Sequence, residues 1–165
     1  MSGSPFTIQT VCTGNICRSP MAAQVLRDWF ADADLSSSVV VGSSGVSAEE
    51  DGNPIDRRAA RALRARGYTP DPRHRAHRIS AEELETTDLI LPATFNHYRV
   101  LASRGADPAG LRMMRQFDPE LADQPAGFAL DIEDPWYGGE QDFELALDQI
   151  EAAAAGVVEY VRGRL

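Results

Sequence analysis

The sequence predicts an α/β fold: a single domain over residues 1–165, in which a four-stranded, parallel, twisted sheet carries helices on both faces. Short apolar or β-branched segments alternate along the chain with longer segments of helical periodicity, which is typical of parallel sheets covered by helices. A length of 165 residues suits one domain with a substantial core. Glycine and proline are spread along the chain, so no long linker is expected.

The expected strands are short. In chain order they are Phe6–Val11, Val39–Val41, Leu89–Leu91 and the weaker Leu111–Met114. Fully apolar strands such as the second and third are typical of parallel sheets that are buried on both faces. The first strand fits this pattern poorly, because Thr7, Gln9 and Thr10 are polar.

Four segments show helical periodicity. They are Met21–Phe30, Ile55–Arg66, Asn96–Ser103 and a long C-terminal segment from Phe143 to Val161. Gly67 follows the second of them directly, and glycine is the preferred residue just past a helix. The last segment is the clearest, since its apolar residues recur at spacings of three and four and form one face.

The composition argues against several classes of protein. A formal net charge of −9 argues against a nucleic-acid partner, which would favour a basic face. The first residues lack the basic and apolar stretches of a secretory signal, and no apolar run approaches the ~20 residues that cross a bilayer. We therefore expect a cytoplasmic protein without a membrane partner. With only Cys12 and Cys17, a disulfide framework is not expected.

The segment Cys12–Arg18 lies between the first strand and the first helix, where parallel sheets bind ligands. Gly14 permits backbone angles closed to other residues, and Asn15 tolerates the left-handed region. A loop curled in this way turns successive N–H groups inward and forms an anion-binding nest, to which the helix N-terminus adds positive charge. The expected phosphate-binding residues are Thr13, Gly14, Asn15, Ile16, Cys17 and Arg18.

Cys12 and Arg18 carry the expected chemistry of this loop. Positive surroundings at a helix N-terminus favour the thiolate of Cys12, which is a nucleophile for the bound phosphorus. Arg18 offers a planar clamp for two phosphoryl oxygens, and Ser19 offers a hydrogen bond to the thiolate. The alternative is a buried small residue followed by a solvated arginine, which leaves the Gly-Asn and Ser-Pro pairs of this segment unexplained.

The stretch Val11–Met21, with its Cys-x5-Arg-Ser pattern, resembles the signature of the low-molecular-weight protein tyrosine phosphatases. The resemblance covers nearly the whole chain and includes Ser43, Gly52–Pro54, His74–Ala76 and Asp134–Pro135. It implies hydrolysis of aryl phosphate monoesters on a phosphotyrosine-containing protein, through a phosphocysteine intermediate. It implies no metal and no cofactor.

A tyrosine leaving group needs a proton donor, because its pKa is near ~10. The chain has four Asp-Pro pairs, which begin at Asp71, Asp107, Asp118 and Asp134. Only the last is followed by two aromatic residues, Trp136 and Tyr137, which offer a flat wall for a phenyl ring. The family that the chain resembles has its acid at this position. Asp134 is therefore the expected general acid, ahead of Asp118.

The resemblance assigns further roles. It implies that Cys17 forms a reversible disulfide with Cys12 and so protects the nucleophile from over-oxidation, the alternative being an inert cysteine. The residues implied to support the phosphate loop are Asn15, Ser19, Ser43 and His74. Tyr137 stands at a position that is often phosphorylated in family members, which makes a tyrosine kinase an expected partner.

Two positions depart from the family pattern. Glu49 stands where an aromatic residue usually lies on the pocket rim, and its carboxylate would repel a phosphate dianion. Thr94 stands where aspartate is common, and its presence predicts a looser clamp if that aspartate orients Arg18. Neither change touches the nucleophile or the acid, so the expected reaction is the same and its expected efficiency is lower.

The sequence leaves three rival interpretations to consider. An arsenate reductase that relays a disulfide needs cysteines after Cys17, and the sequence has none. Zinc binding by His74 and His77 with the two cysteines matches the usual spacing only loosely, so no metal site is expected. A phosphotyrosine-binding module without turnover is the remaining alternative, against which the presence of Asp134 argues.

Overall fold

The structure is a computed structural model that describes residues 3–121 and 123–165. Its strands and α-helices are, in chain order, β1 (Phe6–Cys12), α1 (Arg18–Asp32), β2 (Val39–Gly45), α2 (Arg57–Ala65), α3 (Ala81–Thr86), β3 (Leu89–Pro92), α4 (Phe95–Ser103) and α5 (Glu140–Arg162). Five short 3₁₀ helices follow α4 in the chain: η1 (Pro108–Gly110), η2 (Met114–Phe117), η3 (Pro119–Leu121), η4 (Phe128–Leu130) and η5 (Pro135–Tyr137).

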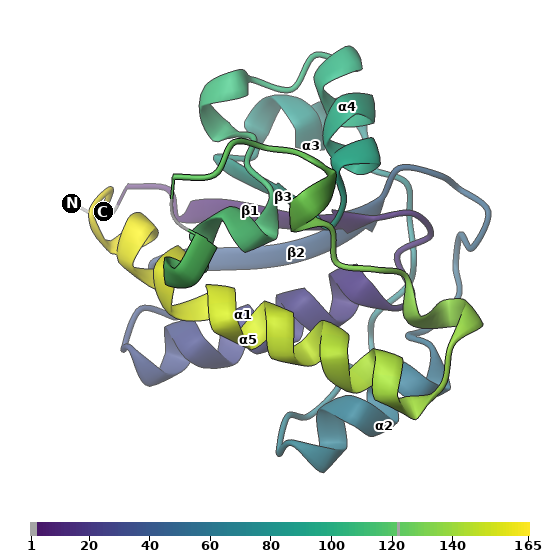
Figure 1. The fold of residues 1–165 in the computed structure, drawn as a ribbon. Helices are drawn as coiled ribbons and strands as arrows, with labels where there is room; N and C mark the ends of the chain where they lie inside the picture. Colours follow the sequence, from purple (N-terminus) through teal and green to yellow (C-terminus); the bar gives the residue numbers. More distant parts are fainter. Residues whose placement is uncertain (1–2, 122) are drawn as a thin grey trace.

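The sheet is parallel, has the order β2-β1-β3, and lies between two layers of helices (Figure 1). Helices α1, α2 and α5 cover one face, and α3 and α4 lie on the other side (Figure 1). The main core is formed by β1, α1 and α5, where Ile8, Leu26 and Leu147 are at most 1% exposed. The predicted parallel sheet and the helices on both of its faces are confirmed.

The predicted fourth strand at Leu111–Met114 is wrong, since the sheet has three strands within the described residues. A single isolated bridge joins Leu111 to Ile90 of β3. The backbone then turns into the 3₁₀ helix η2, whose start is fixed by a hydrogen bond from Met113 N to Gln116 Oε1 at 2.9 Å. Too few residues therefore run beside β3 to form a ladder.

The polar side chains of β1 all have hydrogen-bond partners on neighbouring elements. Thr10 Oγ1 donates to the Ser19 carbonyl in α1 at 2.7 Å, and Gln9 Oε1 accepts from the Ser44 hydroxyl at 2.9 Å. At the start of the strand, Thr7 Oγ1 donates to Asp88 Oδ2 at 3.1 Å. Because each group is paired, the polar residues tie the central strand to α1, β2 and the start of β3 without leaving a buried polar group unsatisfied.

The four predicted helices are confirmed, and a fifth, α3, was not predicted. It has no buried residue and therefore no apolar periodicity that could reveal it. Its signal is a capping box, in which Ser80 Oγ accepts from Glu83 N at 3.0 Å and Glu83 Oε1 accepts from Ser80 N at 2.9 Å. Among the described residues, no helix is both long enough and apolar enough to span a bilayer.

Candidate active site

The loop from Cys12 to Arg18 joins the carboxyl end of β1 to α1, as the sequence predicts. Asn15, and not Gly14, adopts the left-handed conformation, with a φ of 65°. A Cβ at Gly14 would lie 2.9 Å from Glu50 Cγ, so any other residue here would displace the Glu50 side chain at the rim of the cleft. The N-terminus of α1 has no side-chain cap, so its first N–H groups face the loop without a competing side-chain acceptor.

Asn15 is fully buried and organises the loop from behind. Its Oδ1 accepts from the backbone N–H of His77 at 3.1 Å, which identifies its Nδ2 as the donor group. Nδ2 then donates to the hydroxyls of Ser19 at 2.8 Å and Ser43 at 3.0 Å. The left-handed backbone of Asn15 is thus fixed by contacts with β2, α1 and the segment before α3.

Ser19 links this network to the nucleophile. Its Oγ lies 3.1 Å from Cys12 Sγ. Since the same oxygen accepts the amide hydrogen of Asn15, its own hydrogen is free to be donated to the sulfur. A hydrogen bond of this kind stabilises a thiolate and assists its departure from phosphorus. Cys12 itself is 3% exposed at the end of β1.

Arg18 is buried beneath the cleft at 4% exposure. Its Nη1 donates to the Ile132 carbonyl at 2.9 Å, and its Nη2 lies 3.5 Å from Asp134 Oδ2. Within the described residues its Nε has no acceptor, which leaves a donor of the guanidinium unpaired. The main-chain carbonyl of Ile132 orients this clamp, while the Thr94 side chain caps α4 and forms no hydrogen bond with Arg18.

Burial sets the protonation states of His74, which lies behind the loop, and of Cys17, which lies within it. Burial lowers the pKa of His74, so the ring is neutral near pH 7. Its Nε2 lies 2.7 Å from the Asn15 carbonyl, which can only accept, so Nε2 carries the proton. Burial first, and then the charges of Asp56 and Cys12, raise the pKa of the Cys17 thiol, which therefore stays protonated.

His97 is a supporting residue that the sequence analysis missed. It is 5% exposed in α4, and its Nε2 lies 2.8 Å from Thr13 Oγ1 in the phosphate loop. Its Nδ1 accepts from Thr94 N at 3.2 Å, so the ring hydrogen is on Nε2 and is donated to Thr13. Burial first, and then the charge of Arg18, lower the pKa of His97 to about 3. The sequence signal for this residue was the spacing Thr94-x-x-His97, which is that of a capping pair in the first turn of a helix.

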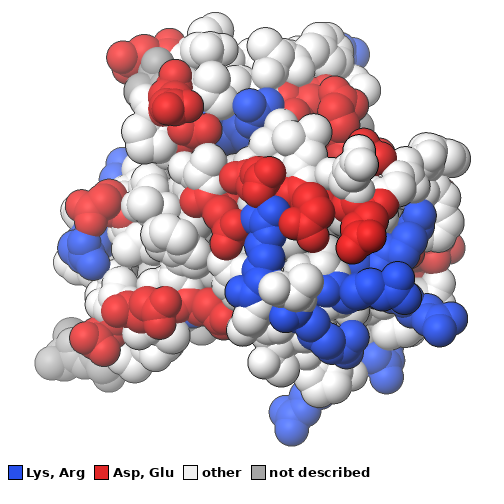
Figure 2. Space-filling model, turned by 60° about the horizontal axis from the view of Figure 1, so that its bottom comes forward, with Lys and Arg blue, Asp and Glu red and all other residues white. Residues whose placement is uncertain are grey.

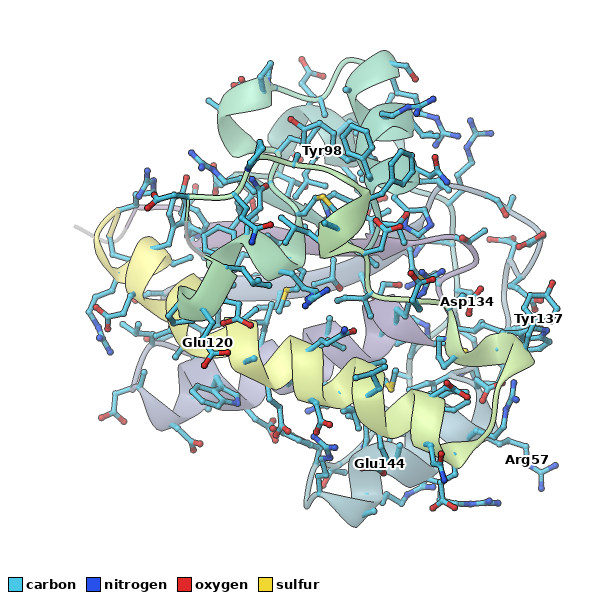
Figure 3. The ribbon with its side chains drawn as sticks, viewed as in Figure 1. Arg57, Tyr98, Glu120, Asp134, Tyr137 and Glu144 are labelled. Carbon is cyan, nitrogen blue, oxygen red and sulfur yellow. The ribbon has the colours of Figure 1, made fainter. Side chains whose placement is uncertain are left out.

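A cleft of about 270 Å³ opens above the phosphate loop. The residues that line it are Cys12, Thr13, Gly14, Ile16, Cys17, Arg18, Glu49, Glu50, Asp134, Trp136 and Tyr137. Asp134 is the N-cap residue of η5, where its Oδ1 accepts from Trp136 N at 3.0 Å, and it points toward the phosphate loop (Figure 3). Tyr137 is 90% exposed at the outer edge of the cleft.

The predicted site residues therefore form two groups. Those expected to react, to bind phosphate or to form the wall lie around the cleft, except Asn15. The residues behind the loop are Asn15, Ser19, Ser43 and His74. His77, which was weighed as a zinc ligand, instead contacts Glu83 at 3.0 Å. Over residues 3–121 and 123–165, no group of three or more His, Cys, Asp or Glu side chains is arranged to hold a metal ion.

Comparisons with known proteins point to one family. The model of the low molecular weight phosphotyrosine protein phosphatases matches residues 7–164. Low molecular weight protein-tyrosine phosphatase A of Mycobacterium tuberculosis is 41% identical over 161 residues, which are 98% of this chain and 94% of that protein. The structure of YfkJ from Bacillus subtilis has a TM-score of 0.87 at 25% identity and covers 99% of both chains.

A further solved structure is the arginine phosphatase YwlE of Bacillus subtilis, in a cysteine-to-serine variant with a phosphorylated active-site serine. Its TM-score is 0.81 at 25% identity, over 95% of this chain and 96% of that one.

Proposed function

Because the chain belongs to the low molecular weight phosphotyrosine protein phosphatase family, we propose that it hydrolyses phosphotyrosine in proteins, with Cys12 as nucleophile and Asp134 as general acid. The observation that carries these assignments is that one cleft is lined by Cys12 at its floor, by the Arg18 clamp, and by a carboxyl group that enters from a separate loop. These are the parts that displacement at a phosphate monoester requires.

In the first step the Cys12 thiolate attacks phosphorus, forming the S–P bond while the bond from phosphorus to the tyrosine oxygen breaks. The proton of Asp134 goes to that oxygen, so tyrosine leaves as a neutral phenol. Arg18 and the N–H groups of the loop bind the equatorial phosphoryl oxygens, where negative charge is concentrated. Ser19 holds the sulfur in line by its hydrogen bond.

In the second step water attacks the phosphocysteine. Asp134, now a carboxylate, takes a proton from the water as the new P–O bond forms and the S–P bond breaks. Cys12 leaves as a thiolate, which the Ser19 hydroxyl stabilises. Inorganic phosphate is released and Asp134 is again protonated. The structure of YwlE with a phosphorylated active-site serine supports a covalent intermediate at the corresponding position of this chain.

The decisive experiment measures hydrolysis of p-nitrophenyl phosphate by the reduced protein in excess chelator, beside the variant Cys12→Ser. We expect turnover by the parent and none by the variant, because a serine hydroxyl is a far poorer nucleophile at neutral pH. Turnover that survives in Cys12→Ser would refute the nucleophile. Failure of both proteins, with retained binding of a phosphotyrosine peptide, would favour the binding module.

Phosphoarginine is a second candidate substrate, and the rim of the cleft favours it. Glu49 and Glu50 stand at the wall, where their carboxylates can accept hydrogen bonds from the guanidinium of a phosphoarginine side chain. YwlE, which this chain resembles, is named as an arginine phosphatase. Matched peptides with phosphotyrosine or phosphoarginine at the same position distinguish the two, and we expect the phosphotyrosine peptide to give the higher kcat/KM.

Two finer proposals concern the setting of the enzyme. Its nucleophile must be a free thiol, a condition that the cytoplasm maintains, so we place its action there. Tyr137 is 90% exposed and borders the cleft, which makes it accessible to a tyrosine kinase. A phosphate on Tyr137 would add negative charge to the wall and oppose the binding of a substrate dianion. The disulfide between Cys12 and Cys17 stays a prediction.

A further inference from the structure

The charges of this chain are strongly segregated. Residues 57–78 hold eight of the sixteen arginines and a single acidic residue, Asp71, although the whole chain has a net charge of −9. Figure 2 shows the result on the surface: arginine side chains gather in the region of α2, beside a band of acidic side chains. A basic surface on an acidic protein concentrates the field locally and selects for acidic partners.

Three arginines of α2 form an exposed stripe: Arg57, Arg61 and Arg64, at spacings of four and three residues. None of the three makes an ion pair or a side-chain hydrogen bond within the part of the chain that the structure describes. Two other arginines of the region have carboxylate partners. Arg58 pairs with Asp56, and Arg66 is held by Glu144, Asp148 and Glu151 of α5. The stripe is therefore free to bind an external anion.

The stripe begins at the edge of the cleft. The N-cap residue of α2, Asp56, donates its backbone N–H to the Ile16 carbonyl of the phosphate loop at 2.8 Å. Arg58 donates to the Trp136 carbonyl at 3.0 Å and stacks over its ring. The first turn of α2 therefore adjoins residues 134–139, the acid loop, which carries Asp134. Figure 3 shows Arg57 at the same end of α5 as Tyr137.

The remainder of the rim has the opposite charge. Glu49 and Glu50 line the cleft from the loop after β2, and Glu49 is exposed. A peptide that carries its phosphorylated side chain into the cleft thus meets negative charge at one wall and positive charge along α2. Such an arrangement distinguishes a peptide whose charged residues precede the phosphorylated residue from a peptide whose charged residues follow it.

We propose that the stripe Arg57, Arg61 and Arg64 binds acidic residues of the substrate protein that flank the phosphotyrosine on one side. This proposal rests on the proposed function and adds a substrate class to it. The stripe spans about 10 Å, at ~1.5 Å per helical residue, and an extended peptide covers that length with about three residues. The preferred substrates therefore carry a short acidic run within a few residues of the phosphotyrosine.

The test compares phosphotyrosine peptides of equal length with an aspartate run before the phosphotyrosine, after it, or replaced by serine. The test variant is Arg57→Gln/Arg61→Gln/Arg64→Gln. The control variant is Arg112→Gln/Arg162→Gln/Arg164→Gln, which removes the same charge from exposed positions near the other end of α5. Hydrolysis of p-nitrophenyl phosphate, which cannot reach the stripe, is measured for every protein.

For the parent and the control variant at low salt, we expect kcat/KM to be about 10-fold higher for one of the acidic peptides than for the serine peptide, because exposed ion pairs are individually weak and three act together. The test variant should lose that preference and hydrolyse p-nitrophenyl phosphate at the parent rate. In ~1 M salt the preference should vanish for all proteins, because the Debye length is then ~3 Å.

The proposal is overturned if the test variant keeps the preference, or if the control variant loses it equally, which would indicate only the overall field. Sedimentation with vesicles that contain phosphatidylserine gives a further outcome. Binding that the test variant loses, without any peptide preference in the parent, would overturn the peptide proposal and assign the stripe to an anionic membrane. Absence of p-nitrophenyl phosphate hydrolysis by the parent would instead contradict the proposed function.

Discussion

The two loops that form the cleft are built in different ways. In the phosphate loop, Cys12, Asn15 and Arg18 are at most 4% exposed, and side chains from β2, α1, α4 and the segment before α3 contact the loop. The acid loop is exposed at Asp134, Trp136 and Tyr137. It is held mainly by its own turn, by buried Pro135 and by hydrogen bonds at its two ends, and the side chains of Arg58 and Arg18 contact it from outside.

This difference indicates a division of labour. The nucleophile and the clamp must be fixed before the substrate arrives, because their geometry determines how the transition state is stabilised. The acid needs only to reach the leaving oxygen, and an exposed loop can adjust to the substrate that occupies the cleft. Changes in the phosphate loop should therefore affect both stability and activity, whereas changes in the acid loop should affect activity alone.

The largest effect that separates the two loops is expected for Asp134→Asn. Asparagine cannot supply a proton, so kcat for phosphotyrosine peptides should fall by about 10²- to 10⁴-fold, the usual contribution of a general acid. The free energy of unfolding should hardly change, because the carboxylate of Asp134 is 41% exposed, its contact with buried Arg18 is long at 3.5 Å, and asparagine keeps the side-chain oxygen that accepts from Trp136 N. Steady-state kinetics and urea unfolding of the same preparation measure both quantities.

A matched control for this variant is Asp118→Asn, at the Asp-Pro pair that ranked second in the sequence analysis. Asp118 lies outside the cleft, and its Oδ1 accepts from Glu120 N in the turn that follows. The activity of Asp118→Asn should therefore equal that of the parent. Loss of turnover in Asp118→Asn together with parent activity in Asp134→Asn would reverse the assignment of the acid.

A smaller effect, in both stability and activity, is expected for Asn15→Ala. Alanine leaves the hydroxyl groups of Ser19 and Ser43 and the N–H of His77 without their partner, at a cost of about 1–3 kcal/mol for a buried unsatisfied group. It also places an ordinary residue at a φ of 65°. The urea midpoint and kcat should both decrease, since Ser19 would no longer be oriented toward Cys12.

The variant Asp34→Ala separates the two causes of destabilisation in Asn15→Ala, which are the lost hydrogen bonds and the left-handed backbone. Asp34 has a φ of 59° but is exposed, and none of the hydrogen bonds described for the site involves its side chain. This variant reports the cost of the backbone conformation alone. If Asn15→Ala destabilises the protein no more than Asp34→Ala does and keeps full activity, then the hydrogen-bond network does not position the phosphate loop.

The sequence predicted the parallel sheet, four of the helices and most of the cleft, because these depend on local patterns. Cys-x5-Arg-Ser is contiguous, and the apolar periodicity of α5 is regular over its length. The prediction of a fourth strand was wrong because a short apolar run does not reveal that η2 begins at Met114. The hydrogen-bond partners of Gln9 and Thr10 could not be predicted either, since they lie on other elements of the fold.

The support of the phosphate loop by His97 could not be read from the sequence for the same reason, as 84 residues separate it from Thr13. The basic stripe of α2 was present in the sequence as a helix rich in arginine. What the sequence did not show is that the stripe is unpaired and begins at the cleft, whereas Arg66 in the same region is neutralised by α5. Ion pairs between α5 and Arg66 leave the arginines of the stripe as the charges that can bind an external anion.

The smallest expected effect comes from the titration of His97. Its pKa is lowered to about 3 in the folded protein, first by burial and then by Arg18. In the unfolded chain a histidine titrates near ~6.5. As the pH falls below that value, the unfolded state takes up a proton that the folded state does not bind. The free energy of unfolding should therefore decrease toward low pH, by at most ~1.4 kcal/mol per pH unit from this residue.

His97→Asn should reduce this slope, and the part that persists is expected from His74, whose pKa is also lowered by burial. Urea unfolding at pH 7 and pH 5 measures the slope where most carboxylates remain charged. Equal slopes for the parent and the variant would show that His97 takes up its proton in the folded state as readily as in water. In that case the ring would become a cation beside Arg18 at pH 5, and its Nδ1 could no longer accept the hydrogen bond from Thr94 N at that pH.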